Sequence, residues 1–315
     1  MCHLGPVEID SELAATDTRR SEHGWVELLL NYTPPFDSKS LLSFLGARAI
    51  PGVEEYADGV YRRSLGLPGG PLVLELEPSR GCVRARYRLA DPSDLAVAVA
   101  VQRSRALLDL DCDPQAVLDV LGRDPTIGSL ACAAPGRRVA GHVDCHELAV
   151  RAVLGQQVSV AGAVTHAARL VSEYGETLEH PVGGVTHVFP TAAALAAADP
   201  EHLAMPRSRR RALLALAAAL AGGELVLDAE VDHARARRAL LALPGIGPWT
   251  TEYIAMRALR DPDAFLETDL GVKRAIEWLG LDSRPRAVTE LAEAWRPYRA
   301  YALAHLWAYS PTIST

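Results

Sequence analysis

Hydrophobic residues recur along most of this chain at the three- and four-residue spacing of an amphipathic helix, and they alternate with polar residues only near the N-terminus. The alternation is clearest at 83–89, where valine, alanine, tyrosine and leucine alternate with arginines, and a run of leucine and valine with Glu75 and Glu77 precedes it at 72–77. These two runs predict a β-hairpin in which Glu75 and Glu77 face the arginines across the strands. The run at 25–32 predicts another strand, which ends at two consecutive prolines.

Capping residues mark the starts of the predicted helices. Asp37 or Ser38 precedes a helix that runs to about position 48, and Ser93 precedes one at 94–108. A short helix is predicted at 53–57. The other predicted helices lie at 115–121, 146–154, 160–174, 192–197, 209–221, 231–241, from 248 onward, 270–279, 288–296 and 298–309. The expected fold class is therefore α+β and mostly α.

Composition is that of a globular protein and sets few limits on function. The 315 residues suffice for two or three domains, and 49% of them are hydrophobic and 23% charged. No apolar stretch reaches the ~18 residues that a membrane span needs. The acidic N-terminus also lacks the basic start and apolar run of a signal peptide. We therefore expect a cytoplasmic protein without a membrane partner.

The net charge of −7, taken for the chain as a whole, argues against a nucleic-acid partner. A phosphate, however, responds mainly to charges within a Debye length of about 8–10 Å. Acidic residues crowd the first 30 positions, whereas arginines cluster at 207–211 and 235–238, the latter just before a glycine-containing loop. Such clusters are either solvated helix faces or phosphate contacts, and their place beside that loop favours phosphate contacts.

The five cysteines are widely spaced and form no CxxC pair. We therefore expect free thiols and neither a structural zinc site nor a disulfide framework. None of the cysteines follows Cys145, which excludes an iron–sulfur cluster held by closely spaced C-terminal cysteines.

The most informative motif is the loop at 243–249, Leu-Pro-Gly-Ile-Gly-Pro-Trp, between two predicted helices. Gly245 and Gly247 permit backbone conformations that other residues avoid, and they leave their N–H groups open to a phosphate. Without a ligand the same loop is simply a tight turn. Asp269 lies twenty residues beyond Trp249, where its carboxylate is a helix N-cap, a catalytic group, or both.

The loop, the helix after it and Asp269 resemble the helix-hairpin-helix superfamily of DNA base-excision-repair glycosylases, and in particular the bacterial 3-methyladenine DNA glycosylase II family. The resemblance covers about 28–309 and includes further motifs in the same order. These are Asn-Tyr-Thr-Pro-Pro-Phe-Asp at 31–37, Leu-Gly-Gln-Gln-Val-Ser-Val at 154–160, Phe-Pro-Thr at 189–191, Ala-Ala-Ala-Asp-Pro at 196–200 and Trp-Arg-Pro-Tyr-Arg-Ala-Tyr-Ala at 295–302.

The resemblance implies a fold of three parts. An N-terminal antiparallel β-sheet domain with helices precedes two helical subdomains, one of them with the helix-hairpin-helix, and the active-site cleft lies between these subdomains. We assign 1–27 to a flexible tail, 28–114 to the α+β domain and 144–262 to the subdomain with the helix-hairpin-helix. The second helical subdomain is assigned to 115–143 and 263–315.

The resemblance also implies a role for individual residues. Asp269 matches the catalytic aspartate, and Gln157 takes the position from which the family inserts a side chain, commonly leucine, into the DNA stack. The residues implied for the base pocket are Trp249, Tyr253, Trp307 and Phe44 from the N-terminal domain. The residues expected to bind DNA are Gly245, Ile246, Gly247, Gln157, Arg207 and Arg209. The carbonyls of Leu243 and Ile246 would hold a sodium or potassium ion that bridges to a phosphate, and no other cofactor is expected.

The implied activity is that of a monofunctional glycosylase acting on alkylated bases. Members that also cleave the strand carry a lysine where this chain has Trp249, and tryptophan cannot form the Schiff base. After the base is flipped out, one carboxylate suffices if the leaving base is already cationic, as 3-methyladenine and 7-methylguanine are. Electron-rich rings favour such a base by roughly 0.5–2 kcal/mol per good contact.

The expected partner is double-stranded DNA with alkylated bases, bound by a monomer. The residues leave two alternative functions open. One is a DNA-binding module that uses the hairpin only to hold a phosphate, which needs neither Asp269 nor the aromatic residues. The other is a glycosylase for oxidised or mismatched bases.

Overall fold

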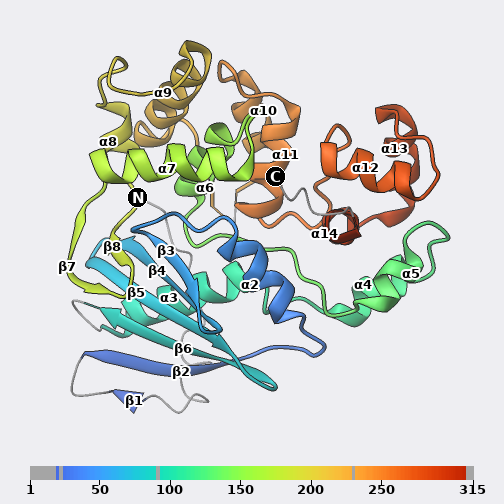
Figure 1. Cartoon of the computed structure of the whole chain (residues 1–315), viewed down its shortest axis with the longest axis horizontal. Coiled ribbons are helices and arrows are strands. Elements are labelled where there is room, and N and C mark those ends of the chain that lie inside the picture. Colours follow the sequence, from blue (N-terminus) through green and yellow to red (C-terminus); the bar gives the residue numbers. More distant parts are fainter. Residues whose placement is uncertain (1–18, 21–23, 90–92, 229–230, 310–315) are drawn as a thin grey trace.

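The computed structural model describes residues 19–20, 24–89, 93–228 and 231–309. An antiparallel sheet forms the N-terminal part, and helices build most of the rest of the molecule (Figure 1), so the predicted α+β, mostly α class is confirmed. Most of the predicted tail lies outside the described residues. The boundary at residue 27 is nevertheless too late, because a strand begins at Trp25 and Val26 is already buried in the core.

The sheet has six strands among the described residues, in the order β1-β2-β6-β5-β4-β3, and all its pairs are antiparallel. The strands are β1 (Arg19–Arg20), β2 (Trp25–Asn31), β3 (Glu54–Ala57), β4 (Val60–Leu67), β5 (Gly70–Pro78) and β6 (Cys82–Leu89). The predicted hairpin is confirmed as β5 and β6. Its charged face is paired as expected, since Arg84 bonds to Glu77 and Arg86 bonds to Glu75.

The helix predicted at 53–57 is wrong, because Glu54–Ala57 forms strand β3 and pairs with β4. Asp58 and Gly59, which connect the two strands, have φ angles of 53° and 80°. An Asp-Gly pair in this left-handed region builds the two-residue turn that best matches the twist of a hairpin. The sequence therefore contained a hairpin signal that outweighs its helical spacing.

Two helices pack against the sheet, and both begin where their capping residues predict. Helix α2 (Ser38–Gly46) contacts β3, and α3 (Asp94–Leu108) contacts β2 and β6. The side chains of Asp37 and Ser93 accept hydrogen bonds from backbone N–H groups in the first turns of these helices. Leucines of both helices share one hydrophobic core with the inner face of the sheet.

The remaining helices form a second core around the buried Trp295. They are α4 (Pro114–Leu121), α5 (Gly128–Ala133), α6 (Cys145–Leu154), α7 (Val160–Tyr174), α8 (Ala192–Ala196), α9 (Arg207–Ala221), α10 (His233–Ala242), α11 (Pro248–Arg257), α12 (Leu270–Trp278), α13 (Pro285–Ala292), the 3-10 turn η1 (Glu293–Trp295) and α14 (Arg299–Tyr309). Apart from α5, a helix was predicted at each of these places, although only the start of α11 was predicted and η1 was expected to continue α13. A small hairpin, β7 (Thr177–Val182) and β8 (Val185–His187), was also missed.

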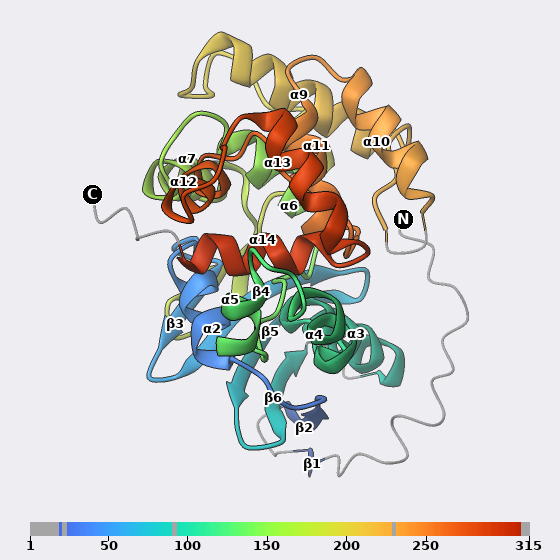
Figure 2. The same cartoon turned by 90° about the vertical axis from the view of Figure 1, so that its right-hand side faces the viewer.

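Three of these helices, α11, α12 and α14, approach α2 of the N-terminal part. Helix α14 contacts both α12 and α5, and α11 packs on α6 and α10 (Figure 2). Side chains from α2, α11, α12 and α14 meet in this region, as described below. Within the described residues, none of the helices combines the length and the apolar character that a membrane span requires.

Candidate functional site

The glycine-containing loop joins α10 to α11 as predicted, but its two glycines have different roles. Gly245 has a φ of 80°, and a Cβ there would lie 2.8 Å from the Cβ of Ala212, so both conformation and close packing require glycine. Gly247 has a φ of −103°, which any residue adopts. Of the two glycines that permit an unusual conformation, only Gly245 adopts one. A Cβ at Gly247 would meet nothing within 4 Å, so this position is open.

Gln156, which was not predicted as a site residue, forms hydrogen bonds that hold the loop. Its amide donates to the carbonyl of Gly245 at 2.9 Å and to the hydroxyl of Thr250 at 3.1 Å. Arg209 donates to the backbone carbonyl of Gln156 at 2.6 Å and also contacts His166. The loop is therefore held in one conformation by α9 and the end of α6. Among the described residues, the N–H groups of Gly245 and Gly247 have no hydrogen-bond partner.

Gln157, the residue after Gln156, is exposed and has a φ of 55°. A left-handed conformation is uncommon for a residue other than glycine and is frequent at functional sites. The structure therefore presents the Gln157 side chain outward on a short, strained turn beside the loop.

Some arginines of the two clusters are exposed, and others form hydrogen bonds or ion pairs within the protein. Arg207 is exposed at the start of α9, whereas Arg209 is half-buried behind the loop. Arg210 bonds to the carbonyl of Pro200, and Arg237 pairs with two carboxylates. The exposed members that remain for a solution partner are Arg207, Arg211, Arg235 and Arg238.

Asp269 is the N-cap of α12, and its Oδ1 accepts from the N–H of Val272 at 3.0 Å. Two indole groups bond to the same carboxylate. The Nε1 of Trp307 donates to Oδ1 at 2.9 Å, and the Nε1 of Trp249 donates to Oδ2 at 3.1 Å. A carboxylate offers about four lone-pair positions, so three are occupied and one position on Oδ2 is left.

Gly271 makes this arrangement possible, although the sequence did not indicate it. A Cβ at this position would lie 2.9 Å from the indole of Trp307 and 3.0 Å from Oδ1 of Asp269. Any larger residue at position 271 would therefore push the tryptophan away from the carboxylate.

The four predicted pocket residues form two stacked pairs. The rings of Trp249 and Tyr253 are 5.2 Å apart with an interplanar angle of 9°. The rings of Phe44 and Trp307, from α2 and α14, are 6.3 Å apart at 13°. Because both tryptophans bond to Asp269, the structure unites all the predicted aromatic residues with the predicted carboxylate, although they come from four separate helices.

Arg257 and Arg48 lie against Phe44 and Tyr253, the two rings that do not bond to Asp269, and neither arginine was predicted. The Arg257 guanidinium donates to the Tyr253 hydroxyl at 2.9 Å and lies 5.1 Å from the centroid of Phe44. The Arg48 guanidinium lies 3.8 Å from the same centroid. Burial alone would raise the pKa of Tyr253, but the guanidinium groups of Arg257, Arg48 and Arg151 together outweigh burial and lower it.

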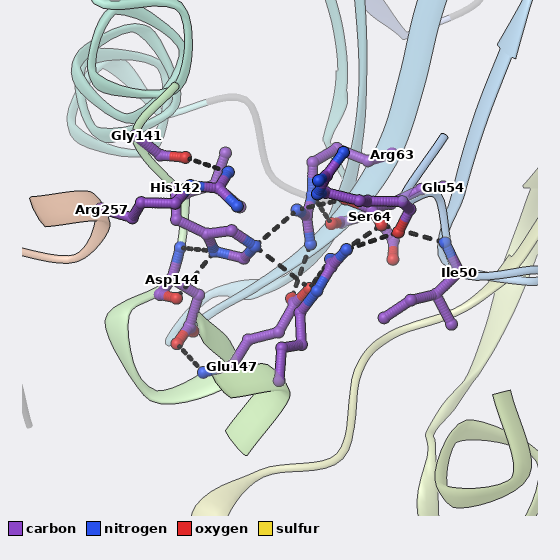
Figure 3. A network of polar contacts seen from close by, with 12 residues as sticks. Ile50, Glu54, Arg63, Ser64, Gly141, His142, Asp144, Glu147 and Arg257 are labelled. Carbon is purple, nitrogen blue, oxygen red and sulfur yellow. Dashed lines mark hydrogen bonds and ion pairs between the residues drawn. The ribbon is translucent and has the colours of Figure 1, made fainter. Parts of the chain in front are cut away.

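A buried ionic network joins the sheet to α6 next to this region (Figure 3). Arg63 of β4 pairs with Glu54 at 3.0 Å and with Glu147 of α6 at 2.6 Å, and Arg151 pairs with the same two carboxylates. Arg151 also donates to the carbonyl of Arg48 at 2.6 Å. The network therefore fixes the part of the N-terminal domain that carries Phe44 and Arg48.

The same network contains a cluster with the composition of a metal site, Glu54, His142 and Glu147. Its carboxylates already pair with Arg63 and Arg151, so the arginines supply the positive charge that a metal ion would bring. Burial and the surrounding guanidinium groups lower the pKa of His142 well below its ordinary value. We therefore interpret this cluster as a structural link with a neutral histidine.

Similarity to known proteins assigns the chain to a family. Residues 27–144 match the model of the AlkA N-terminal domain, and residues 150–298 match that of the HhH-GPD superfamily base excision DNA repair protein. The probable bifunctional transcriptional activator/DNA repair enzyme AlkA of Mycobacterium tuberculosis (strain H37Rv) is 47% identical over 307 residues, which cover 97% of this chain and 62% of that protein. The chain thus spans less than two thirds of that relative.

Two further proteins match the chain over nearly their whole length. The DNA-3-methyladenine glycosylase 2 of Escherichia coli (strain K12) is 38% identical over 88% of this chain and 95% of its own. The structure of the 3-methyladenine DNA-glycosylase from Archaeoglobus fulgidus has the same fold, with a TM-score of 0.77 and 23% identity over 91% of this chain and 99% of its own. This chain therefore belongs to the HhH-GPD superfamily of base excision DNA repair proteins and carries an AlkA N-terminal domain.

Proposed function

We propose that this protein is a monofunctional DNA glycosylase that releases alkylated, cationic purines such as 3-methyladenine and 7-methylguanine and leaves an abasic site. The observation that carries the proposal is the Asp269 carboxylate, held by two indole N–H groups at the edge of two stacked aromatic pairs. The activities named for the relatives in Escherichia coli and Archaeoglobus fulgidus agree with it.

The four rings would receive the flipped base. A base stacked between Phe44 and Trp307 needs about 7 Å, twice the ~3.4 Å spacing of stacked bases. The two rings are nearly parallel with centroids 6.3 Å apart, so a movement of either ring that opens the gap between their planes would admit a base. Stacking of this kind is worth roughly 1–3 kcal/mol per base and tolerates different bases, so we expect a broad range of substrates.

The bond between C1′ of the sugar and the base nitrogen breaks, and its electron pair stays with the base. The positive charge of an alkylated base thereby moves to the sugar, where Asp269 stabilises it. Water then adds to C1′ and loses its proton to the solvent. Because three donors occupy Asp269, its one remaining lone-pair position serves either the sugar or the water. We propose that it faces the sugar, so electrostatic stabilisation is its main role.

Double-stranded DNA would be held by the loop at Gly245, Ile246 and Gly247, where the N–H groups of the two glycines, unpartnered among the described residues, suit a phosphate. Exposed Arg207 adds positive charge beside the loop. Half-buried Arg209 would act through Gln156, which it positions. Gln157 would enter the base stack after flipping, since its strained turn already presents it outward. We further propose that the protein works as a cytoplasmic monomer, because one lesion occupies one site.

We also propose that the carbonyls of Leu243 and Ile246 hold a monovalent cation at the loop. The Leu243 carbonyl accepts one hydrogen bond, from the Ile246 N–H at 3.3 Å, and keeps its second lone pair. When bound there, sodium or potassium supplies a positive charge that attracts a DNA phosphate. The loop residues themselves orient the backbone N–H groups around that phosphate.

The test is release of free bases from methylated duplex DNA by the wild type and by Asp269→Asn. The substitution is nearly isosteric and keeps an oxygen that caps α12. We expect the wild type to release methylated purines and the variant to lose at least 100-fold in rate while it still binds DNA. Equal rates would show that Asp269 is only a helix cap, and preference for neutral 8-oxoguanine would contradict the selection of cationic bases.

A further inference from the structure

Opposite charges lie at the two ends of the stacked aromatic pairs. In each pair one ring contacts the carboxylate and the other contacts a guanidinium. Trp249 and Trp307 donate to Asp269, whereas the centroids of their partners, Tyr253 and Phe44, lie 5.7 and 5.1 Å from the Arg257 guanidinium. The aromatic group is therefore polar along its length, with a negative end at Asp269 and a positive end at Arg257.

The positive charge at Arg257 is buried and lacks a carboxylate partner. The residue is 4% exposed, and its remaining donors bond to the backbone carbonyls of Ala140 at 2.8 Å and Gly141 at 2.9 Å (Figure 3). Nothing acidic in the described chain forms an ion pair with Arg257 or with neighbouring Arg48. A buried charge that is not neutralised is expensive, so its retention beside the site calls for a function.

We propose that Arg257, assisted by Arg48, is a positioning residue that speeds cleavage by attracting negative charge onto the leaving base. This inference rests on the proposed function. When the C1′–N bond breaks, the base gains an electron pair and its charge falls by one, whether it starts cationic or neutral. A fixed positive charge at the base end and Asp269 at the sugar end both favour that displacement.

Tyr253 transmits the effect to the base. A guanidinium can only donate hydrogen bonds, so the Tyr253 oxygen accepts from Arg257, and its own proton is left to be donated to the leaving base. The lowered pKa of the hydroxyl, which the surrounding guanidinium groups cause against the opposing effect of burial, agrees with a stronger donor. Arg257 thus acts through Tyr253 and does not itself touch the base.

The same charge has an opposite effect on binding, which makes the proposal testable. A cationic base is repelled in the ground state, whereas a neutral base is not. Removal of the charge therefore slows cleavage of both kinds of base but tightens binding of the cationic kind only. A residue that merely held α11 against Ala140 and Gly141 would weaken both kinds together.

The experiment compares Arg257→Met, Arg257→Lys and Arg48→Met with the wild type on duplexes that contain 7-methylguanine or neutral hypoxanthine. Single-turnover rates at saturating enzyme and the half-saturating enzyme concentrations are measured for each. Arg286→Met, at an exposed position on α13, is the matched control. Circular dichroism establishes that each variant is folded.

We expect Arg257→Met to lower the saturated rate at least tenfold on both duplexes and to lower the half-saturating concentration for 7-methylguanine alone. Arg257→Lys keeps the charge and stays within about threefold of the wild type. Arg48→Met shows a smaller change in the same direction and carries the test if Arg257→Met does not fold.

Equal losses in Arg257→Met and Arg257→Lys would overturn the proposal in favour of a structural role. Unchanged saturated rates in Arg257→Met and Arg48→Met would overturn it as well. A wild type that releases no base from methylated DNA would instead refute the proposed function, so the two failures are distinguishable.

Discussion

Buried charges are arranged in opposite ways in two neighbouring regions of this molecule. Between the sheet and α6, Arg63 and Arg151 contact Glu54 and Glu147 directly, so positive and negative groups neutralise each other. Around the aromatic rings, Asp269 and Arg257 are kept on separate sides of the stacked pairs. Charges that touch link two parts of a fold, whereas charges held apart create a field that can act on a substrate.

The largest effect is expected from breaking the neutralised region. Arg63→Met would leave Glu54 and Glu147 buried with too little positive charge, which costs about 3–5 kcal/mol of unfolding free energy. Urea unfolding measures it. The control is Arg84→Met, which breaks an exposed pair with Glu77 and should cost at most about 1 kcal/mol. Similar losses in both variants would show that the buried network is not a special link between sheet and helix.

A smaller effect, on activity instead of stability, is expected in the aromatic region. Trp307→Phe keeps a ring beside Phe44 but removes the N–H that bonds to Asp269. A hydrogen bond to a charged group is worth roughly 1.5–3 kcal/mol, so base release should slow by about 10- to 100-fold. Trp278, which is 63% exposed, supplies the control Trp278→Phe. An unchanged rate in Trp307→Phe would mean that the indole does not position the carboxylate.

The pH dependence of the free energy of unfolding tests the neutralised region, because His142 belongs to it. The pKa of His142 is well below its ordinary value in the folded protein, so the unfolded chain binds a proton more readily near pH 6. Stability from the neutral histidine is therefore complete above about pH 6.5 and declines as the pH falls below it, by at most about 1.4 kcal/mol per pH unit. Urea titrations from pH 7.5 to 5 should show a shallower decline in His142→Gln than in the wild type.

Much of the fold followed from local signals in the sequence. Asp37, Ser93 and Asp269 were each predicted to be able to cap a helix, and each does so. One failure was also local, since the Asp58-Gly59 turn was overlooked when a short helix was predicted at 53–57. A turn that requires a left-handed conformation is the more specific signal.

The site was predicted less completely, for a physical reason. Asp269 and the four aromatic residues were identified through family motifs, and the structure brings them together. Gln156, Gly271 and Arg257 were missed, because their roles depend on partners distant in the chain or on packing against Trp307. Gln156 contacts Gly245 and Arg257 contacts Ala140, and one sequence without a fold does not indicate such contacts.

The smallest effect on stability is expected at Gly247 of the loop. A comparison with Gly245 shows which glycine the fold requires and which one DNA binding requires. Gly247→Ala has an ordinary φ and free space around the new Cβ, so stability should change by less than about 0.5 kcal/mol. The methyl group would nevertheless stand among the N–H groups offered to a phosphate, and affinity for duplex DNA should fall several-fold. Gly245→Ala, with a φ of 80° and Ala212 in the way, should instead lose about 1–3 kcal/mol of stability. Fluorescence anisotropy measures the DNA affinity of both variants, and urea unfolding measures their stability. Unchanged DNA affinity in Gly247→Ala would mean that the loop is only a turn and does not hold a phosphate.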